Sequence, residues 1–498
     1  MLISSHAAEP TAPAPQFPLD VAVRHALAQS PALRVEEAQV EMREGVREQA
    51  SGEFDWFASL SASRSRDRIP MIDPLGRETV DAGETTAYVA GVTRKLRSGI
   101  LVQPFVEVGV PEQHSPIGPT LGASNLQLQI VVPLLRGLGH DSTGAAEAAA
   151  RGDVEVARLL YRHALARHAF ETVRAYWTAR AAQGVLAVRQ DDERRADKLH
   201  EGIRVLVDAR VFAPNLLLQS EANLRQKSTN RQDAELTATN ARFELARVMG
   251  LPPASLLSAP QPDQPFPENI ALSSALQTGI VRGQWVERAF RQRADYLATK
   301  QSEVPLKILA RQAELDLKPR LDLSVRGGYA GLNRGNDLFA PLSHRLTGAN
   351  GEVGLVLDWP VQNTFQRGLL RERRAAQRQS EFITAQAQTD IAAEVSSALA
   401  EVQLRAETVR NAAATAEIAR KAVEQEQRRL QTGEATVLDV INLENLLSSA
   451  QLSQIDAQAG YAIAVARLRY SIGEIFTDET ADRSFQLSDL TRPPADEK

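Results

Sequence analysis

The sequence predicts a mixed α/β protein with two internal repeats, in which paired strands precede very long helical hairpins. Three observations predict this fold class. Four helical stretches are far longer than the helices of ordinary globular domains. Short runs of alternating apolar and polar residues precede the long hairpins. A shift of 223 positions superimposes parts of the second half on the first.

The composition limits the chemistry of the chain. It has 498 residues, of which 43% are apolar and 24% charged, a net charge of −5 and no cysteine. The lack of cysteine removes disulfides, thiolate metal ligands and cysteine nucleophiles, and it suits an oxidising compartment. The balance of charge offers no basic stripe for nucleic acid. No apolar run approaches the roughly 18 residues of a membrane-spanning helix.

Residues 1–17 are expected to form a flexible N-terminal segment. The stretch "SHAAEP" is typical of the small-residue end of an export signal and is followed by a Pro-rich start. We therefore expect an export signal that was removed or mis-annotated. An ordinary disordered N-terminus explains the same residues.

The first predicted repeat covers residues 18–250. A helix over 18–50 precedes strands within 53–133 and a long helical hairpin over 141–250. The hairpin is rich in Ala, Gln, Glu and Arg, so we expect its helices to pack through a slim apolar stripe. The residues of that stripe are Leu159, Ala166, Phe170, Val173 and Trp177.

The second predicted repeat covers residues 286–473 and follows a linker over 251–285. Its elements keep the order of the first repeat: a helix over 286–316, strands over 319–331 and 351–360, and a long hairpin over 363–473. A C-terminal tail over 474–498 completes the chain.

Several equivalent positions in the two halves hold the same residue. The shift of 223 places Glu221 on Glu444, Leu224 on Leu447, Asp233 on Asp456, Leu245 on Leu468 and Gly250 on Gly473. Each hairpin ends in an apolar residue and a glycine, as a glycine stop at a helix C-terminus requires. Two halves of similar design are hard to explain by chance.

The predicted strands have one apolar face. In "EVGLVLDWP" (352–360), one face carries Val353, Leu355, Leu357 and Trp359, and the other carries Glu352, Gly354 and Asp358. The segments "PRLDLSVRGGY" (319–329) and "NLQLQIVVP" (125–133) alternate likewise, whereas "EFDWFASLSAS" (53–63) is weaker because Phe57 falls on the polar side. Pro133 and Pro360 mark the transitions from strand to helix.

The sequence does not fix how many strands each half contributes. Polar loops over 67–84 and 330–351 are expected to separate the strands of each pair. Residues 85–110 have no counterpart in the second half, and they form either a surface hairpin or two further strands.

A single copy has too few strands for a closed membrane barrel. A soluble sheet is the commoner setting for such strands, but they are too few for a sandwich, and nothing obvious covers a second face. Membrane barrels begin at about eight strands, and lipid does not tolerate bare strand edges. A membrane setting therefore requires several chains to share one barrel.

In order, spacing and duplication, these segments resemble the TolC-like outer-membrane efflux proteins. The resemblance covers nearly the whole chain, including "LDVAVRHALAQSPAL" (19–33), "ERAFRQRADYL" (287–297), "LKPRLDLSV" (317–325) and "QIVVPLLRG" (129–137). Its most specific part is "LQTGEATVLDVINLE" (430–444), which "VARLRYSIG" (465–473) follows.

The resemblance implies a homotrimer whose β-barrel lies in outer-membrane lipid and whose helices extend through the periplasm. It implies an exit channel of a tripartite efflux or type I secretion system. Such a channel works with a periplasmic adaptor (membrane fusion protein) and, through it, an inner-membrane pump, without a cofactor. The cargo stays open among drugs, metal ions, metabolites and polypeptides, and the barrel stays open between 12 and 18 strands.

The resemblance also places the channel entrance at the turns between paired helices. In the family's best-known member the second turn reads Tyr-x-x-Gly-x-Arg-x-x-x-Asp-x-x-Asp, and the equivalent positions here are Leu430, Gly433, Ala435, Asp439 and Asn442. The Tyr/Arg-based lock therefore cannot be assumed. One interpretation of Asp439 is a ring that selects cations. The other is a helix cap together with Thr436.

The first turn departs further from the family pattern. The expected adaptor-contact residues are Arg210, Val211, Phe212, Pro214 and Leu216. Under the shift, Arg210 takes the glycine position and Leu216 the aspartate position. Pro214 suits the first turn of a helix, and a simply packed turn is the alternative for Phe212.

Two other protein classes compete with the channel. A periplasmic coiled-coil adaptor or scaffold explains long helices, but adaptors carry one hairpin flanked by compact β domains. An enzyme needs a nucleophile, a metal or a carboxylate pair, and none stands out; His163 and His168 have poor spacing for a ligand pair. We therefore expect no catalytic residue, no metal site and no cofactor.

Overall fold

The structure, a computed structural model, describes residues 16–72, 75–113, 121–211, 213–256, 259–267, 279–334, 346–476, 490–492 and 494. It divides into two compact units. The helical unit comprises residues 1–39, 158–298 and 384–498, and the sheet unit comprises residues 40–157 and 299–383. None of the helices in the described part of the chain combines the length and hydropathy that crossing a membrane requires.

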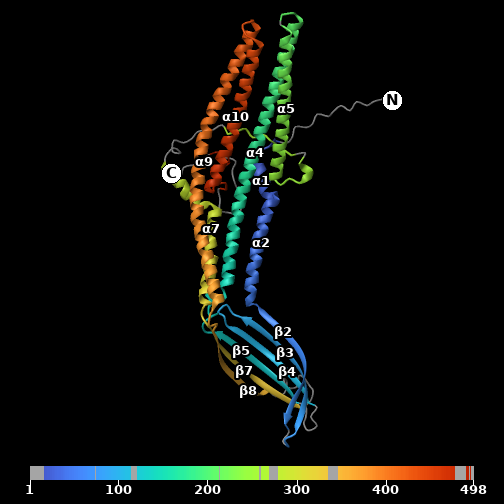
Figure 1. Cartoon of the computed structure of the whole chain (residues 1–498), viewed down its shortest axis with the longest axis vertical. Coiled ribbons are helices and arrows are strands. Elements are labelled where there is room, and N and C mark those ends of the chain that lie inside the picture. Colours follow the sequence, from blue (N-terminus) through green and yellow to red (C-terminus); the bar gives the residue numbers. More distant parts are fainter. Residues whose placement is uncertain are drawn as a thin grey trace, which may run out of the picture. The chain divides into compact units, whose positions relative to one another are not determined.

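Two very long helices dominate the chain, α4 with 64 residues and α9 with 68. The helices are α1 (Leu19–Gln29), α2 (Pro31–Ser51), α3 (His140–Thr143), α4 (Ala145–Asp208), α5 (Asn215–Val248), α6 (Gly279–Gln292), α7 (Ala294–Leu315), α9 (Thr364–Gln431) and α10 (Val437–Ile472). In the helical unit, α4 with α5 and α9 with α10 form two hairpins (Figure 1).

The sheet unit contains an antiparallel six-stranded sheet in the order β2-β3-β4-β5-β7-β8 (Figure 1). Its strands are β2 (Trp56–Ile72), β3 (Glu78–Lys95), β4 (Leu101–Gln113), β5 (Leu121–Pro133), β7 (Arg320–Arg334) and β8 (Leu346–Asp358). Among the described residues, β2 and β8 each have a single strand neighbour. They are therefore the two edges of the sheet.

The sheet is larger than the expected strand pairs. Residues 85–110 belong to β3 and β4, which lie inside the sheet, so they are two further strands. The loop expected over 67–84 is mostly strand, because polar residues pair there; Arg64 and Glu84 form a 2.7 Å ion pair across β2 and β3. Of the loop expected over 330–351, residues 335–345 lie outside the described part.

The strand register gives the sheet one apolar and one polar face. On the apolar face, Val353 pairs with Val325, which pairs with Ile130. On the polar face, Arg326 stands between Gln129 and Glu352.

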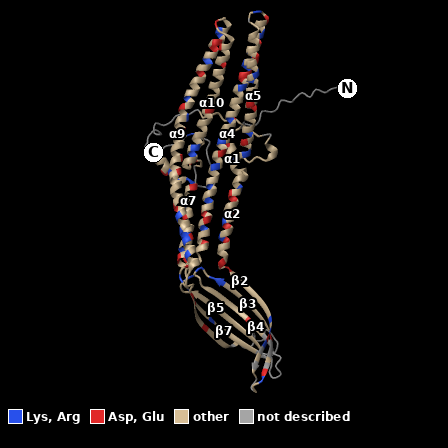
Figure 2. Cartoon of the chain, in the orientation of Figure 1, with Lys and Arg blue, Asp and Glu red and all other residues tan. Residues whose placement is uncertain are grey.

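The apolar face of the sheet is open to the surroundings. Leu60 of β2 is 80% exposed, Val353 of β8 73% and Leu355 of β8 66%, and few charges lie in the middle of the strands (Figure 2). A soluble monomer rarely exposes so continuous an apolar surface, which usually marks contact with lipid or protein.

In the helical unit, each short entering helix packs on the long hairpins. α1 joins residues of α4, α5 and α10 in one core cluster, and α6 joins residues of α9 and α10 in another. Of the predicted stripe on α4, Val173 and Trp177 are fully buried, whereas Leu159, Ala166 and Phe170 are partly buried. The start of α1 is also tied to α4 by a hydrogen bond. The Tyr176 hydroxyl of α4 donates to the carbonyl of Phe17, just before α1, over 2.8 Å.

The helices expected over 18–50 and 286–316 are both broken. The first divides at Ser30 into α1 and α2, and the second at Arg293 into α6 and α7. At each break a glycine with positive φ approaches the backbone. A Cβ on Gly250 would lie 2.9 Å from Ser30 Cα, and one on Gly473 would lie 3.0 Å from Arg293 N. Periodicity misses such a break because the apolar pattern continues across it.

Gly473→Ala tests this packing. The substitution places a methyl group against the Arg293 backbone at a residue with φ +82°, so we expect a loss of about 2 kcal/mol or more in stability. Gly202→Ala is the matched control, because Gly202 lies inside α4 with open space around its Cβ; it should gain up to about 1 kcal/mol. Hydrogen exchange of α10 and α4 amides measures both changes, and equal effects would contradict the packing.

Candidate functional site

The second hairpin turn joins α9 to α10 through Gly433. Gly433 has φ +79°. Its N–H donates to Leu430 O over 3.1 Å, and the N–H of Glu434 donates to Arg429 O over 2.8 Å. This pair of bonds is the Schellman arrangement that ends a helix, and glycine adopts its left-handed conformation without a Cβ penalty.

Asp439 caps α10 together with Thr436. The Asp439 N–H donates to Thr436 Oγ1 over 3.2 Å, and the Thr436 N–H donates to Asp439 Oδ2 over 3.0 Å, which is a capping box. The Thr436 hydroxyl also donates to Asp439 Oδ2 over 2.6 Å. These bonds, the hydroxyl first, lower the pKa of the exposed Asp439 carboxyl. The geometry of Asp439 is therefore that of a helix cap.

The first hairpin turn repeats this geometry without a glycine. Arg210 has φ +61°, and the N–H groups of Arg210 and Val211 donate to carbonyls three and five residues earlier, both over 2.9 Å. Arg210 thus adopts the conformation of Gly433, its equivalent under the shift, despite the steric cost to a side chain. Pro214 directly precedes α5, Val211 is 65% exposed, and Phe212 lies outside the described residues.

Residues from both turns meet in one small apolar cluster, which we call the tip cluster. It contains Leu430 and Leu216 together with Leu199, Ile203, Val207, Val437 and Ile441. Ala435 is only partly buried, and Asn442 is exposed. The structure therefore brings Leu216 and Leu430 together and leaves Asn442 on the surface.

A layer of polar side chains, four of them buried, follows the tip cluster along the hairpins. We call it the polar layer; it consists of Arg189, Asp192, Arg195, Lys227, Gln427, Glu444, Asn445 and Ser448. Ser448 donates a 2.5 Å hydrogen bond to Asp192 Oδ2, linking α10 to α4. Lys227 donates a 2.7 Å hydrogen bond to Asn445 Oδ1, linking α5 to α10.

Three charged residues of the polar layer, Asp192, Lys227 and Glu444, are desolvated. Asp192 is 3% exposed and Glu444 4%. Arg195 pairs with Asp192, and Arg189 Nη1 lies 3.5 Å from Asp192 Oδ2. Burial raises the pKa of Glu444, against the charges of Arg195 and Lys227 and a 3.2 Å hydrogen bond from Gln427. Burial likewise lowers the pKa of Lys227.

Sequence reasoning does not find the polar layer. Asp192, Lys227 and Glu444 read as charges on ordinary solvated helix faces, since burial depends on which helices pack against them. A usable signal is present: Glu444 and Ser448 are spaced four residues apart and interrupt the apolar positions Ile441 and Leu447 on α10.

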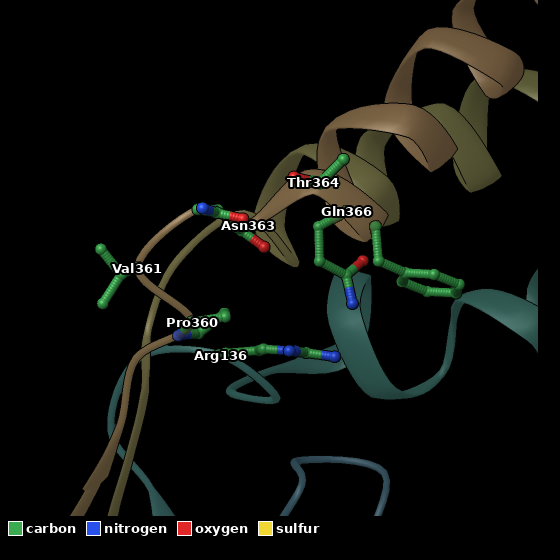
Figure 3. A pocket seen from close by; sticks show the side chains of 8 residues that line it. Arg136, Pro360, Val361, Asn363, Thr364 and Gln366 are labelled. Carbon is green, nitrogen blue, oxygen red and sulfur yellow. The ribbon is translucent and has the colours of Figure 1, made fainter.

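A second candidate site lies where strands turn into helices in the sheet unit. Pro133 ends β5, and Pro360 follows β8 by two residues. A cavity of about 600 Å³ opens beside Pro360, which we call the corner pocket; it is lined by Arg136 and residues 360–366 (Figure 3). Asn363 supports the corner with a 2.9 Å hydrogen bond from its Nδ2 to Leu317 O. In the described part of the chain, no group of three or more acidic or histidine side chains is placed to hold a metal ion.

Part of the sequence matches a known protein family. Residues 285–474 match the sequence family described as outer membrane efflux protein. No curated protein matches the chain.

Several solved structures share the fold of nearly the whole chain. The outer-membrane channel OprN has 18% identity and a TM-score of 0.69, with 92% of this chain and 90% of that chain covered. The CmeC outer-membrane channel of Campylobacter jejuni has 15% identity and a TM-score of 0.69 (92% and 85%). The outer-membrane protein VceC of Vibrio cholerae has 16% identity and a TM-score of 0.67 (91% and 96%).

The chain therefore has the fold of outer-membrane channels. The family match and the shared fold confirm the resemblance to outer-membrane efflux proteins that the sequence indicates.

The bond between Asp192 and Ser448 can be tested by a double-mutant cycle. Asp192→Ala leaves Arg189 and Arg195 without their buried partner and should cost about 3 kcal/mol, and Ser448→Ala should cost about 1.5 kcal/mol. The double variant should lose less than the sum, with a coupling of about 1 kcal/mol. Hydrogen exchange of α10 amides near Ser448 provides the free energies. Strictly additive losses would show that the two side chains act independently.

The raised pKa of Glu444 predicts a pH dependence. A carboxyl whose folded pKa lies above its unfolded value favours folding while it is protonated, and that stability is lost as pH rises through the folded pKa. Glu444→Gln should therefore raise the thermal midpoint at neutral pH and flatten its fall above the ordinary carboxyl range. Glu424→Gln, on an exposed position of α9, is the control. A Glu444→Gln protein with the wild-type pH profile would contradict the burial argument.

Proposed function

We propose that this chain is the subunit of an outer-membrane channel that exports cargo from the periplasm. The observation that supports this most strongly is the exposed apolar face of the six-stranded sheet. Aromatic side chains lie near both limits of that face, Trp359 just beyond the end of β8 that leads into α9 and Tyr329 on β7, opposite Ala349. The ten steps from Ala349 to Trp359, at about 3.3 Å each and a tilt of about 40°, span about 25 Å. This is the height of the apolar band of an outer-membrane barrel.

The opposite face suits a wall around water. The side chains of its middle rows are small or neutral, such as Ser59 and Ser61 on β2, Gln103 on β4 and Gln127 on β5. Its middle rows also carry Arg326, paired with Glu352 over 3.4 Å. A lining of this kind lets hydrated solutes pass without selecting strongly for charge.

The width of the six strands matches the width of the four helices that connect to them. Four helices connect directly or through a short turn to its strands: α2, α4, α7 and α9. Four helices about 9 Å apart occupy about 36 Å of circumference. Six tilted strands about 4.8 Å apart occupy about 38 Å. A barrel of strands and a barrel of helices can therefore join without a change in width, and we propose that three copies form both, with 18 strands.

Exposed apolar residues on the helices also favour assembly of copies. Leu404 is 65% exposed and Ile418 69%, and their spacing of two heptads places both on one side of α9. Two internal repeats explain why the hairpin turns and the Gly250 and Gly473 helix ends share one geometry. An adaptor or scaffold protein accounts for neither the apolar sheet nor its open edges.

We place the channel gate at the hairpin turns. Packing of Leu216 and Leu430 in the tip cluster ties one hairpin to the other, and separating them would free the turns to move. The exposed residues Arg210 and Val211 are available to a periplasmic adaptor that couples the channel to an inner-membrane pump, in an efflux or type I secretion system. In this arrangement the sheet lies in the outer membrane and the helices in the periplasm.

The conductance of the protein in planar bilayers tests channel and gate together. Val437 is 2% exposed inside the tip cluster, whereas the next residue, Leu438, is 54% exposed outside it. Val437→Ser should loosen the cluster and raise single-channel conductance severalfold, and Leu438→Ser should leave it unchanged. If no variant conducts, the channel function is wrong. If all conduct equally, the gate does not depend on the tip cluster.

A further inference from the structure

Phe57 is a large aromatic residue in an unexpected place. It lies on the polar face of the edge strand β2, where the next residues on that face are Ser59 and Ser61 and its partner across the ladder is Thr93. Phe57 is 68% exposed. Covering an exposed phenylalanine at a strand edge with another surface removes its apolar area from water and is therefore favourable.

The corner pocket, at the other edge of the sheet, has the chemistry of a receptor for an aromatic ring. Two of its walls are very exposed apolar side chains, Val361 at 91% and Phe365 at 77%. Gln366 is 8% exposed and its Oε1 has no hydrogen-bond partner. In Figure 3 the Gln366 side chain points toward Arg136 across the pocket. A ring in the pocket can present its face to the Arg136 cation and pack against the exposed side chains of Val361 and Phe365.

Strand direction brings these two features together when copies pair edge to edge. β8 runs into the corner pocket, and β2 begins at Trp56 and runs away from the helices. In an antiparallel pair between copies, the start of one β2 therefore lies beside the end of the neighbouring β8.

The faces of the strands restrict the register of that pair. Trp56 and Trp359 both belong to the apolar side, whereas Phe57 and Asp358 both belong to the polar side. A one-residue slip would place apolar side chains opposite polar ones. Pairing Trp56 with Trp359 puts Phe57 opposite Asp358 and diagonal to Pro360, within the reach of an aromatic side chain.

We propose that Phe57 of one copy seats in the corner pocket of the next copy, with β2 paired to β8 in the register that aligns Trp56 with Trp359. The inference rests on the proposed shared barrel and adds its register and its anchor. Each pocket is incomplete alone, because the ring that fills it comes from a second copy of the chain.

Cysteine pairs test the register, and the lack of natural cysteine makes them specific. The register places Ser59 opposite Val356 of the neighbour, both on the polar side. Oxidation of Ser59→Cys/Val356→Cys protein in membranes should give linked dimers and trimers at least tenfold above the matched control Ser59→Cys/Leu357→Cys, whose second side chain lies on the other face. Equal linking of both pairs, or linking of the control alone, would overturn the register.

A photoreactive residue tests the anchor. With p-benzoylphenylalanine in place of Phe57, irradiation should link copies, and mass spectrometry should locate the link in residues 360–366 of the other copy. The same replacement at Phe105, on the polar side of the interior strand β4, should give at least tenfold less linking between copies. Native mass spectrometry of the wild-type protein separates two failures. A monomer refutes the shared barrel, whereas a trimer whose Phe57 analogue links elsewhere refutes only the anchor.

Discussion

The two open edges of the six-stranded sheet are the constraint on which the rest of the structure depends. Water is absent from the interior of a bilayer, so backbone N–H and C=O groups along β2 and β8 need partners there. The sheet of one copy cannot supply them, because β2 and β8 stand at opposite ends of the strand order. Copies of the chain can, since the start of β2 and the end of β8 match in direction and in the alternation of their faces. In the proposed barrel, the exposed Leu60 and Val353 would face lipid, and the serine-rich side would face water.

The long helices are held in position by specific contacts rather than by a large apolar core. The apolar stripes along the hairpins are narrow. Close glycine contacts and small side-chain clusters therefore fix how the helices align. Gly250 and Gly473 allow close approach to the breaks at Ser30 and Arg293. Near the turns, the tip cluster and the polar layer join one hairpin to the other. Buried charges such as Asp192 and Glu444 are costly to desolvate and favour one specific alignment of helices over others. A joint of this kind holds the two hairpins in register near their turns.

Much of this fold follows from sequence pattern, and the departures have physical reasons. Alternation located the strands around Val353 and Ile130, and small-residue periodicity located the long hairpins. The pattern failed where strands become polar, as at Arg64 and Glu84, because hydrophobic alternation is then lost although the ladder continues. It also failed at Ser30 and Arg293, where tertiary packing rather than propensity breaks a helix. Of the candidate site, the Thr436–Asp439 cap was readable from spacing. The polar layer was not, because it is assembled from residues more than two hundred positions apart, such as Asp192 and Ser448.

The most direct test of the central claim is a cryo-electron microscopy reconstruction of the full chain in lipid nanodiscs. The account predicts a closed wall in lipid, built from the six strands of each of three copies, with β2 of one copy hydrogen-bonded to β8 of the next. A particle in which each copy closes its own sheet, or in which the sheet lies outside the lipid, would contradict it.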